Sequence, residues 1–294
     1  MADLEELRTF TIAARLGSFA RAARQLNLSP AMVGRRIQGL EERYGIKLIE
    51  RTTRSQHLTE RGREFLTRAE VVLDAAEALA DCSEADNYSG RIRLTAPTMI
   101  GVTRLPPVLA RFGADHPDVI FEVNLSNRRV DLVGEGFDLA IRVGELPSSG
   151  LITRRIGTYR FACCASPEFI RRNGELTHPA QLAQVRCVLN LNLMPRDRWP
   201  FIAADGEEIT VTVGGGVEID YDEAQRILAL SGTGIVYLPL DLVSDDLSAG
   251  RLVSLFPDWR MPSMPIHSVQ PSRALVPRRI RAFVEALAIE FRSS

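Results

Sequence analysis

The sequence predicts an α/β protein in three parts: a small helical N-terminal module, one long helix, and a two-lobed α/β body. Helical patterns with start and stop signals fill residues 1–44, and from Glu60 to about Ala85 apolar residues repeat at helical spacing without proline. Strands and helices alternate after Arg91, which is the pattern of a mainly parallel sheet covered by helices. The 294 residues, 45% hydrophobic and 25% charged, suit a folded chain of more than one domain. The expected bounds are 1–59 for the module, 60–88 for the helix and 89–294 for the body, with lobe I at about 89–164 and 267–294 and lobe II at about 165–266.

The N-terminal module should contain three helices. Residues 4–15 and 19–26 carry apolar side chains at helical spacing. Ser29 and Pro30 then give the strongest start signal in the chain, because Ser favours the N-cap and Pro the first helical position. A third helix is therefore predicted from Pro30 to about Arg43.

The third helix has one apolar stripe and one polar face. The residues predicted to face the core are Val33, Ile37, Leu40 and Tyr44. At roughly 100° per residue, Ala31, Arg35 and Gln38 project from the opposite side, and Arg36 lies on the flank. Arginine can bridge guanine O6 and N7, glutamine can pair with adenine, and a flanking arginine can bind phosphate. This face suits a DNA major groove, and the alternative is an ordinary solvated helix face.

Residues 45–59 predict a small β-hairpin, or wing, around a polar tip, and Thr59 is a natural N-cap for the long helix that follows. The tip groups suit phosphate and the minor groove: Arg51, Thr52, Thr53, Arg54 and His57. Residues 1–62 hold eleven Lys and Arg against seven Asp and Glu, a net charge of +4 in a chain of −1. A basic module on an acidic body indicates a polyanionic partner. The candidate DNA contacts are Ser29, Pro30, Ala31, Arg35, Arg36, Gln38, Arg51, Thr52, Thr53 and Arg54.

With these motifs in order, residues 4–62 resemble the winged helix-turn-helix of LysR-type transcriptional regulators. The resemblance rests on Phe10, Gly17-Ser18-Phe19, Ala22-Ala23, Leu26, Ser29, Val33 to Glu41, Gly45, Leu48, Arg51 and Leu58 to Gly62. It implies a bacterial regulator that binds double-stranded DNA as a homodimer or homotetramer. The sequence departs from the family at Gly34, where Ser or Thr is usual. Glycine weakens a helix by about 1 kcal/mol relative to alanine and removes a hydroxyl that could reach DNA.

The long helix carries an apolar seam over about two heptads: Phe65, Ala69, Val72, Ala76 and Leu79. The seam predicts pairing with a second chain, and packing against the chain's own module is the alternative. The family resemblance implies that this helix dimerises the modules, which would then read an inverted repeat with half-sites about one helical turn apart. Asn87 to Gly90 is similar to a hinge into the body.

The body is predicted from alternating patterns. Expected in the first lobe are strands 91–96, 119–125 and 137–143 and helices near 103–112 and 129–134. Expected in the second are helix starts at Ser166 and Thr177, strands 211–213, 216–219 and 234–238, a hairpin bend at 214–216 and a helix at 221–231. Residues 266–270 should return to the first sheet, and 276–291 should form a closing amphipathic helix. The body resembles the two-lobed periplasmic-binding-protein-like (type 2) effector domain of LysR-type regulators.

Two such lobes create a ligand cleft at the carboxyl ends of the strands. The candidate effector contacts are Pro97, Thr98, Ser126, Asn127, Arg128, Arg142, Asn192, Tyr221, Asp222 and Thr233. Thr98 opens a helix and could hold a carboxylate or act only as its N-cap. Arg142 could anchor an anion or form a salt bridge with Asp138 or Glu145. A small organic anion is the expected effector.

The sequence predicts no catalytic residue, metal site or cofactor. The four His are scattered, and no H-E-x-x-H, G-x-S-x-G or P-loop motif occurs. A solute-binding protein or an enzyme with an α/β body and no DNA role is the alternative, but it would leave the basic module unexplained. No apolar run approaches the roughly 20 residues of a membrane span, and no signal-peptide pattern begins the sequence, so we expect a cytoplasmic protein. The Cys have no metal spacing, which favours free buried thiols over a redox switch: Cys82, Cys163, Cys164 and Cys187.

Overall fold

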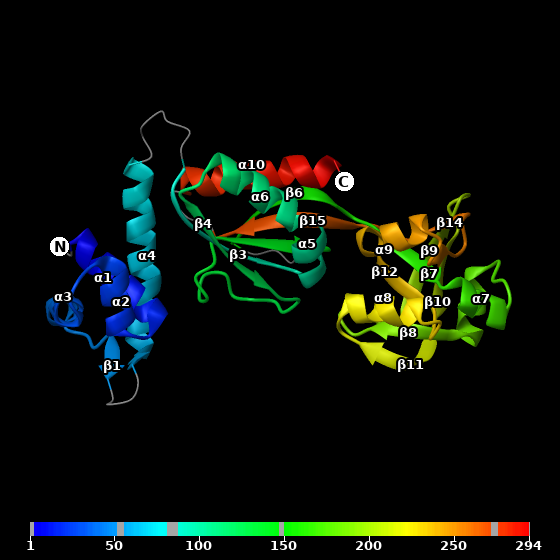
Figure 1. Cartoon of the computed structure of the whole chain (residues 1–294), viewed down its shortest axis with the longest axis horizontal. Helices are drawn as coiled ribbons and strands as arrows, with labels where there is room; N and C mark the ends of the chain where they lie inside the picture. The colour runs from blue at the N-terminus through cyan, green and yellow to red at the C-terminus, as the bar shows by residue number, and fades with distance from the viewer. Residues whose placement is uncertain (1–2, 52–55, 81–87, 147–149, 272–275, 294) are drawn as a thin grey trace.

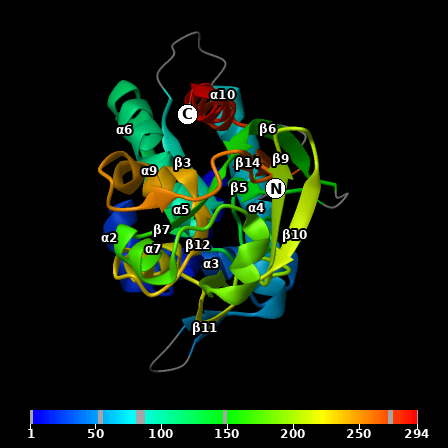
Figure 2. The same ribbon diagram turned by 90° about the vertical axis from the view of Figure 1, so that its right-hand side faces the viewer.

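The computed structural model describes residues 3–51, 56–80, 88–146, 150–271 and 276–293, which form three bodies along the longest axis (Figure 1). The N-terminal module lies at one end, lobe I in the middle and lobe II at the far end. The long helix α4 (Glu60–Ala80) packs on the module and faces lobe I. Figure 2 looks along this axis from the lobe II end.

The N-terminal module contains the three predicted helices, α1 (Leu4–Leu16), α2 (Phe19–Leu26) and α3 (Pro30–Tyr44). Ser29 caps α3, because its hydroxyl accepts a hydrogen bond from the backbone N–H of Met32 at 3.2 Å. Gly45 ends it at φ 64°, in the left-handed region that favours glycine. The wing is confirmed as the antiparallel pair β1 (Ile49–Arg51) and β2 (Gln56–Leu58), which leads into α4.

The predicted core stripe of α3 is confirmed for Val33, Ile37 and Leu40, which are fully buried. It is wrong for Tyr44, which is 46% exposed. Tyr44 is the last residue of α3, where the helix leaves the core, and its ring meets that of Phe65 edge-on at 5.0 Å. The seam residues Phe65 and Ala69 follow the alternative considered for α4, because both pack against the module's own core.

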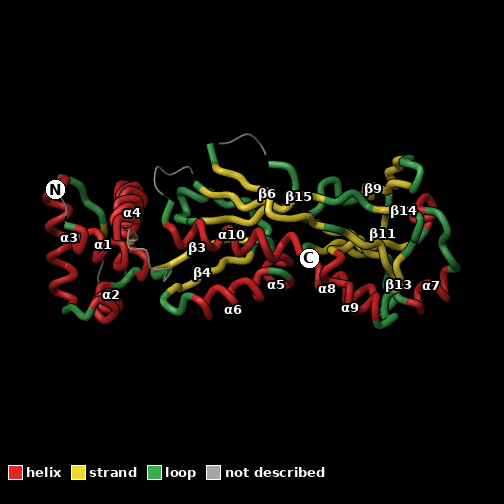
Figure 3. The backbone as a smooth tube through the Cα atoms, turned by 90° about the horizontal axis from the view of Figure 1, so that it is seen from above, coloured by secondary structure: helices red, strands yellow, loops and turns green. Residues whose placement is uncertain are grey.

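Lobe I is built on a five-stranded sheet of order β4-β3-β5-β15-β6. Strands β3 (Gly90–Ala96), β4 (Val119–Leu125) and β5 (Leu139–Val143) are parallel, while β15 (Met264–Gln270) runs antiparallel between β5 and β6 (Ile152–Tyr159). The return of the chain to the first sheet is thus confirmed. Helices α6 (Leu105–Asp115) and α10 (Arg278–Ser293) cover one face of the sheet (Figure 3), with Phe283, Leu287 and Phe291 of α10 buried.

One helix prediction in lobe I is confirmed and one is wrong. The helix expected near 103–112 is α6, which begins at Leu105, and the helix expected to open at Thr98 is the separate helix α5 (Thr98–Thr103); the two part at Arg104. Pro106 and Pro107 follow and have no N–H to continue the hydrogen bonds of α5. Residues 129–134 form turns instead of a helix, and the Asp131 carboxylate accepts a bond from the Val133 N–H at 3.1 Å.

Lobe II contains two sheet systems. Strand β7 (Phe161–Ala165) pairs with β12 (Val236–Pro239) and β13 (Val253–Ser254). Strand β8 (Arg186–Asn190) pairs in parallel with β11 (Gly214–Ile219), and its Cys187 bridges to Ile235, the residue before β12. A separate antiparallel sheet has the order β10-β9-β14: Glu208–Thr212, Arg198–Ala203 and Trp259–Arg260. The helical elements are α7 (Pro167–Asn173), a short 3-10 helix (Pro179–Gln184), α8 (Asp222–Leu230) and α9 (Leu240–Ser248).

Three expectations for lobe II are corrected. The hairpin bend at 214–216 is the start of β11, because β10 and β11 belong to different sheets. A Cβ on Gly215 would lie 1.6 Å from the Cys187 carbonyl oxygen, so the close approach of β11 to β8 requires glycine. The helix expected at Thr177 begins at Pro179, with His178 as its cap. The first crossing between lobes, expected near residue 164, lies at Arg160 between β6 and β7.

Three of the four cysteines are free and buried in lobe II: Cys163, Cys164 and Cys187. Burial raises the pKa of the Cys187 thiol to about 12 and that of Cys164 to about 12. A thiol that remains protonated is a poor nucleophile, so these side chains act as small apolar packing groups. Cys82 lies outside the described residues.

Candidate nucleic-acid interface and inter-lobe cavity

The outer face of α3 is available to a partner. Ala31, Arg35 and Gln38 are exposed, opposite the buried stripe, as the periodicity predicts. Arg36 is partly buried, and its Nη1 donates to the Thr9 hydroxyl at 2.9 Å, which ties α3 to α1. The face therefore presents a small residue, a cation and an amide along the N-terminal half of α3, a set that can read base edges.

The wing follows α3 in the sequence. Its described register pairs Ile49 with Leu58 and Glu50 with His57, and His57 is exposed. Three candidate contacts, Thr52, Thr53 and Arg54, lie outside the described residues, as does the side chain of Arg51. Their role in DNA binding stays a prediction.

Glu41 positions the wing, a role that the sequence did not indicate. Its Oε1 accepts hydrogen bonds from the backbone N–H groups of Leu48 at 2.8 Å and Ile49 at 3.1 Å, and its Oε2 pairs with Lys47. Desolvation opposes ionisation, but the bonds from Lys47 and the two N–H groups outweigh it and lower the pKa of Glu41. The carboxylate thus fixes β1 to α3. Only its spacing to Lys47 could have indicated this contact.

The linker helix keeps part of its predicted seam on the surface. Val72 is 47% exposed and its neighbour Val71 is similarly exposed, while Ala76 is partly buried. The side chain of Leu79 lies outside the described residues. An exposed pair of valines on a helix is apolar area that a second chain could cover.

A cavity of 420 Å³ opens between the two lobes. Lobe I contributes Thr98, Leu125, Ser126, Asn127 and Arg128, and lobe II contributes Asn192, Asp220 and Tyr221. Six of these eight are predicted effector contacts, drawn together from strand ends far apart in sequence. The cavity therefore lies where the carboxyl ends of the parallel strands of lobe I meet lobe II.

Several predicted contacts have other roles. Thr98 is not an N-cap, because Pro97 occupies that position and the Asn127 side chain accepts the Thr98 N–H bond at 3.1 Å. Asp222 is buried and accepts a bond from Asn190 Nδ2 at 2.5 Å. Burial raises the pKa of Asp222 to about 6. Pro97, Asp222 and Thr233 do not line the cavity.

Arg142 also lies outside the cavity lining, and among the described residues it forms no salt bridge with Asp138 or Glu145. Its Nη2 is buried without a hydrogen-bond partner, and the Nδ1 of His267 on the facing strand is in the same state. Burial, with the charge of Arg129 second, lowers the pKa of the Arg142 guanidinium. A half-buried cation with an unused donor is suited to an anion.

The described ranges contain no group of three or more His, Cys, Asp or Glu arranged to hold a metal ion. In the same ranges, no helix has the length and hydropathy that crossing a bilayer requires.

The chain is similar to known proteins along its whole length. Residues 4–63 match the family model of bacterial regulatory helix-turn-helix proteins of the lysR family, and residues 85–292 match the LysR substrate binding domain. The HTH-type transcriptional regulator YhjC of Escherichia coli is 33% identical, over 98% of this chain and 97% of YhjC. PtxR of Pseudomonas aeruginosa is 33% identical, over 97% of this chain and 92% of PtxR. The structure of CrgA, a LysR-type transcriptional regulator from Neisseria meningitidis, superposes with a TM-score of 0.64 at 30% identity over 99% of each chain.

Proposed function

The chain belongs to the LysR family of DNA-binding transcriptional regulators, and from this premise we propose that it binds an inverted-repeat operator as a homo-oligomer and responds to a small organic anion held between its lobes. The observation that carries the operator-binding part is the exposed face of α3, with Arg35 pointing away from a fully buried stripe. The proposal gives the chain no catalytic step and places it in the cytoplasm, where the DNA is.

Arg35→Ala is expected to weaken operator binding by about 1–3 kcal/mol, because a bidentate contact to guanine would be lost. Electrophoretic mobility or fluorescence anisotropy with the operator and with an unrelated duplex separates base reading from phosphate contact. The operator affinity should fall while the affinity for unrelated DNA changes little.

Arg171→Ala is the matched control, since it removes an exposed arginine of lobe II, paired with Glu168, without touching the module. Equal operator affinity for wild type and Arg35→Ala would remove Arg35 from base recognition. Equal weakening on both duplexes would assign it to phosphate.

The proposed dimer forms along α4, whose exposed surface includes Val72 and Val71. Two modules joined on a two-fold axis would place their α3 helices in successive major grooves. Because Phe65 and Ala69 stabilise the module itself, the contact between chains is shifted to the solvent-facing side of the helix.

Val72→Glu is expected to lower the self-association constant by tenfold or more, because it buries a carboxylate in an apolar contact. Sedimentation velocity over a concentration series measures this. Ile289→Glu, a similar change at a 63% exposed position of α10, is the control. Dimerisation that is unaffected by Val72→Glu and weakened by Ile289→Glu would move the interface away from α4.

The proposed effector site combines the inter-lobe cavity with Arg142. Arg128 lines the cavity, its neighbour Arg129 is near enough to perturb Arg142, and Arg142 has a buried Nη2 without a partner. An anion that binds the two lobes more tightly in one relative orientation shifts the oligomer toward that orientation. The size of this shift is set by the difference between the anion's affinities for the two orientations.

Arg142→Met is expected to abolish the stabilisation of the protein by its effector, found by thermal-shift screening of mono- and dicarboxylates. We expect a carboxylate to raise the melting temperature of the wild type and of Arg171→Met alike. A shift of the same size in Arg142→Met would contradict the anchoring role. Operator binding by Arg142→Met without ligand should equal that of the wild type.

A further inference from the structure

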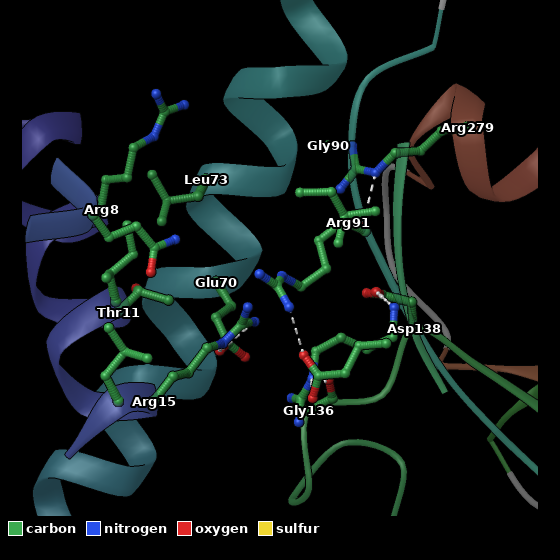
Figure 4. Close-up of a pocket in the computed structure, with 16 residues that line it drawn as sticks. Arg8, Thr11, Arg15, Glu70, Leu73, Gly90, Arg91, Gly136, Asp138 and Arg279 are labelled. Atoms are coloured by element: carbon green, nitrogen blue, oxygen red, sulfur yellow. Dashed lines mark hydrogen bonds and ion pairs between the residues drawn. The ribbon is translucent and has the colours of Figure 1, made fainter. Parts of the chain in front are cut away.

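A second cavity, of 540 Å³, lies between the DNA-binding module and lobe I (Figure 4). Helices α1 and α4 form one wall, and strands β3 and β4 with the turn at Gly136 form the other. It shares no lining residue with the inter-lobe cavity. The proposed effector site therefore does not account for it.

Part of the wall is apolar. Ile12, Leu16 and Leu73 contribute from the module and α4, and Ile120 contributes from β4. Ile120 is 55% exposed, and it lies on the sheet face opposite α6 and α10. Isoleucine at this position leaves apolar surface in water that a ligand could cover.

The rest of the wall is rich in arginine. Five arginines and three carboxylates line the cavity, which gives it an excess of positive charge: Arg8, Arg15, Arg91, Arg93 and Arg279 against Glu70, Glu122 and Asp138. Arg8 and Arg15 come from α1, and Arg91 and Arg93 come from β3. Figure 4 shows Arg8 and Arg15 on one side of the cavity and Arg91 on the other. The pairs are formed within each body, Arg15 with Glu70 at 2.9 Å and Arg91 with Glu122 at 3.0 Å. Cations of the two bodies therefore face one another across the cavity, which favours an anion between them.

The two bodies approach each other at Glu70 and Gly136. A Cβ placed on Gly136 would lie 3.2 Å from Glu70 Oε2 and 2.7 Å from Arg93 Nη1. Arg93 Nη1 donates to the Gly136 carbonyl oxygen at 2.8 Å, and this hydrogen bond fixes the conformation of the turn that faces α4. On the module side, the hydroxyl of Thr11 is buried without a hydrogen-bond partner. The wall thus includes an unused polar group as well as charge.

We propose that this cavity is a second ligand site, which takes a small organic anion with an apolar body, such as an aromatic or branched aliphatic carboxylate or sulfonate. The apolar part would cover Ile120 and Leu73, and the anionic group would lie between the arginines of α1 and β3. A ligand held by both bodies fastens the DNA-binding module to lobe I. Its binding is therefore coupled to the orientation of the module on DNA.

Anilinonaphthalene sulfonate, an aromatic anion that fluoresces when bound in an apolar site, is the probe for the full-length chain. We expect saturable binding to the wild type. Ile120→Glu replaces apolar surface by a negative charge that repels the anionic probe, and it is expected to weaken probe binding by tenfold or more. Ile289→Glu, the matched change on α10, should alter the affinity by less than twofold. Arg91→Gln is a milder change at a half-exposed position, and it should weaken binding severalfold. It tests the site even if Ile120→Glu disturbs folding.

Affinity that is unchanged in both Ile120→Glu and Arg91→Gln, or an absence of saturable binding, would overturn this site. Binding that is lost in Arg142→Met but kept in Ile120→Glu would place the probe between the lobes. That result would refute the second site and leave the proposed effector site standing. Loss in Ile120→Glu with retention in Arg142→Met would establish the second site independently of the first.

Discussion

Asp241→Asn is expected to lower the free energy of unfolding by about 3–5 kcal/mol, and Arg104→Met by clearly less. Arg104 lies at the break between α5 and α6 and is only 4% exposed. Its Nε donates to Asp241 Oδ2 at 2.5 Å and its Nη1 to the Thr158 carbonyl at 3.2 Å. Asp241 belongs to the first turn of α9, so this ion pair joins lobe I to lobe II beside the crossing strands.

The two substitutions differ because the partners left behind differ. After Arg104→Met, Asp241 keeps a side chain that is 22% exposed and the favourable N-terminus of α9. After Asp241→Asn, a buried guanidinium loses its counter-charge, and its Nη2 already lacks a partner. The ring of Phe291 at 5.9 Å offers only a weak cation–π contact in return.

Urea unfolding followed by tryptophan fluorescence measures both effects, since Trp199 is buried in lobe II. Arg171→Met breaks the exposed pair with Glu168 and should leave the unfolding midpoint unchanged. If Arg104→Met were the more damaging of the two, the guanidinium would act mainly through its packing. The charge left without a partner would then not be what destabilises the protein.

The sequence predicted the N-terminal module well because its signals are local. A capping serine, a proline at the first helical position and a glycine with positive φ fix both ends of α3 within a few residues. The buried stripe then follows from helix periodicity alone. It fails only at Tyr44, where the helix ends and periodicity no longer determines what lies beneath.

The body was predicted less well because its pairings join distant residues. The glycine run at 214–216 could not be assigned to β11 without knowing that Cys187 lies against it. Strands such as β7, with every residue buried, lack the alternation that identifies a strand from sequence. The partners of Arg104 could not be predicted either, because its side chain bonds to Asp241 in lobe II and to the Thr158 carbonyl in lobe I, both far away in the sequence.

The inter-lobe cavity was predictable in outline, because strand carboxyl ends gather at one edge of a parallel sheet. The direction of each side chain was not. Asp222 begins α8, one residue after the predicted start, but turns inward to Asn190, and Arg142 does not line the cavity. A heptad pattern likewise cannot distinguish a partner chain from the chain's own core, against which Phe65 and Ala69 pack.

Asp222→Asn is expected to stabilise the protein at pH 7.5 relative to the wild type and to have little effect at pH 4. Burial raises the pKa of Asp222 to about 6, against an ordinary value of 3.8. Between pH 3.8 and about pH 6 the folded protein holds a proton on Asp222 that the unfolded chain releases. The contribution of Asp222 to stability therefore falls as the pH rises through this interval. The difference between 3.8 and about 6 corresponds to roughly 3 kcal/mol above pH 6.

Asparagine imitates the protonated acid, because its side-chain oxygen can accept the bond from Asn190 without a buried charge. Urea unfolding of the wild type and of Asp222→Asn from pH 4 to 7.5 gives the difference between their free energies of unfolding. Carboxylates with lowered pKa values, such as Glu41 and Glu122, contribute equally to both proteins and therefore cancel in this difference. Asp245→Asn, on the exposed surface of α9, is the control. A variant that loses stability toward neutral pH would instead show that Asn190 and the N-terminus of α8 hold Asp222 as the anion, and that these donors outweigh its burial.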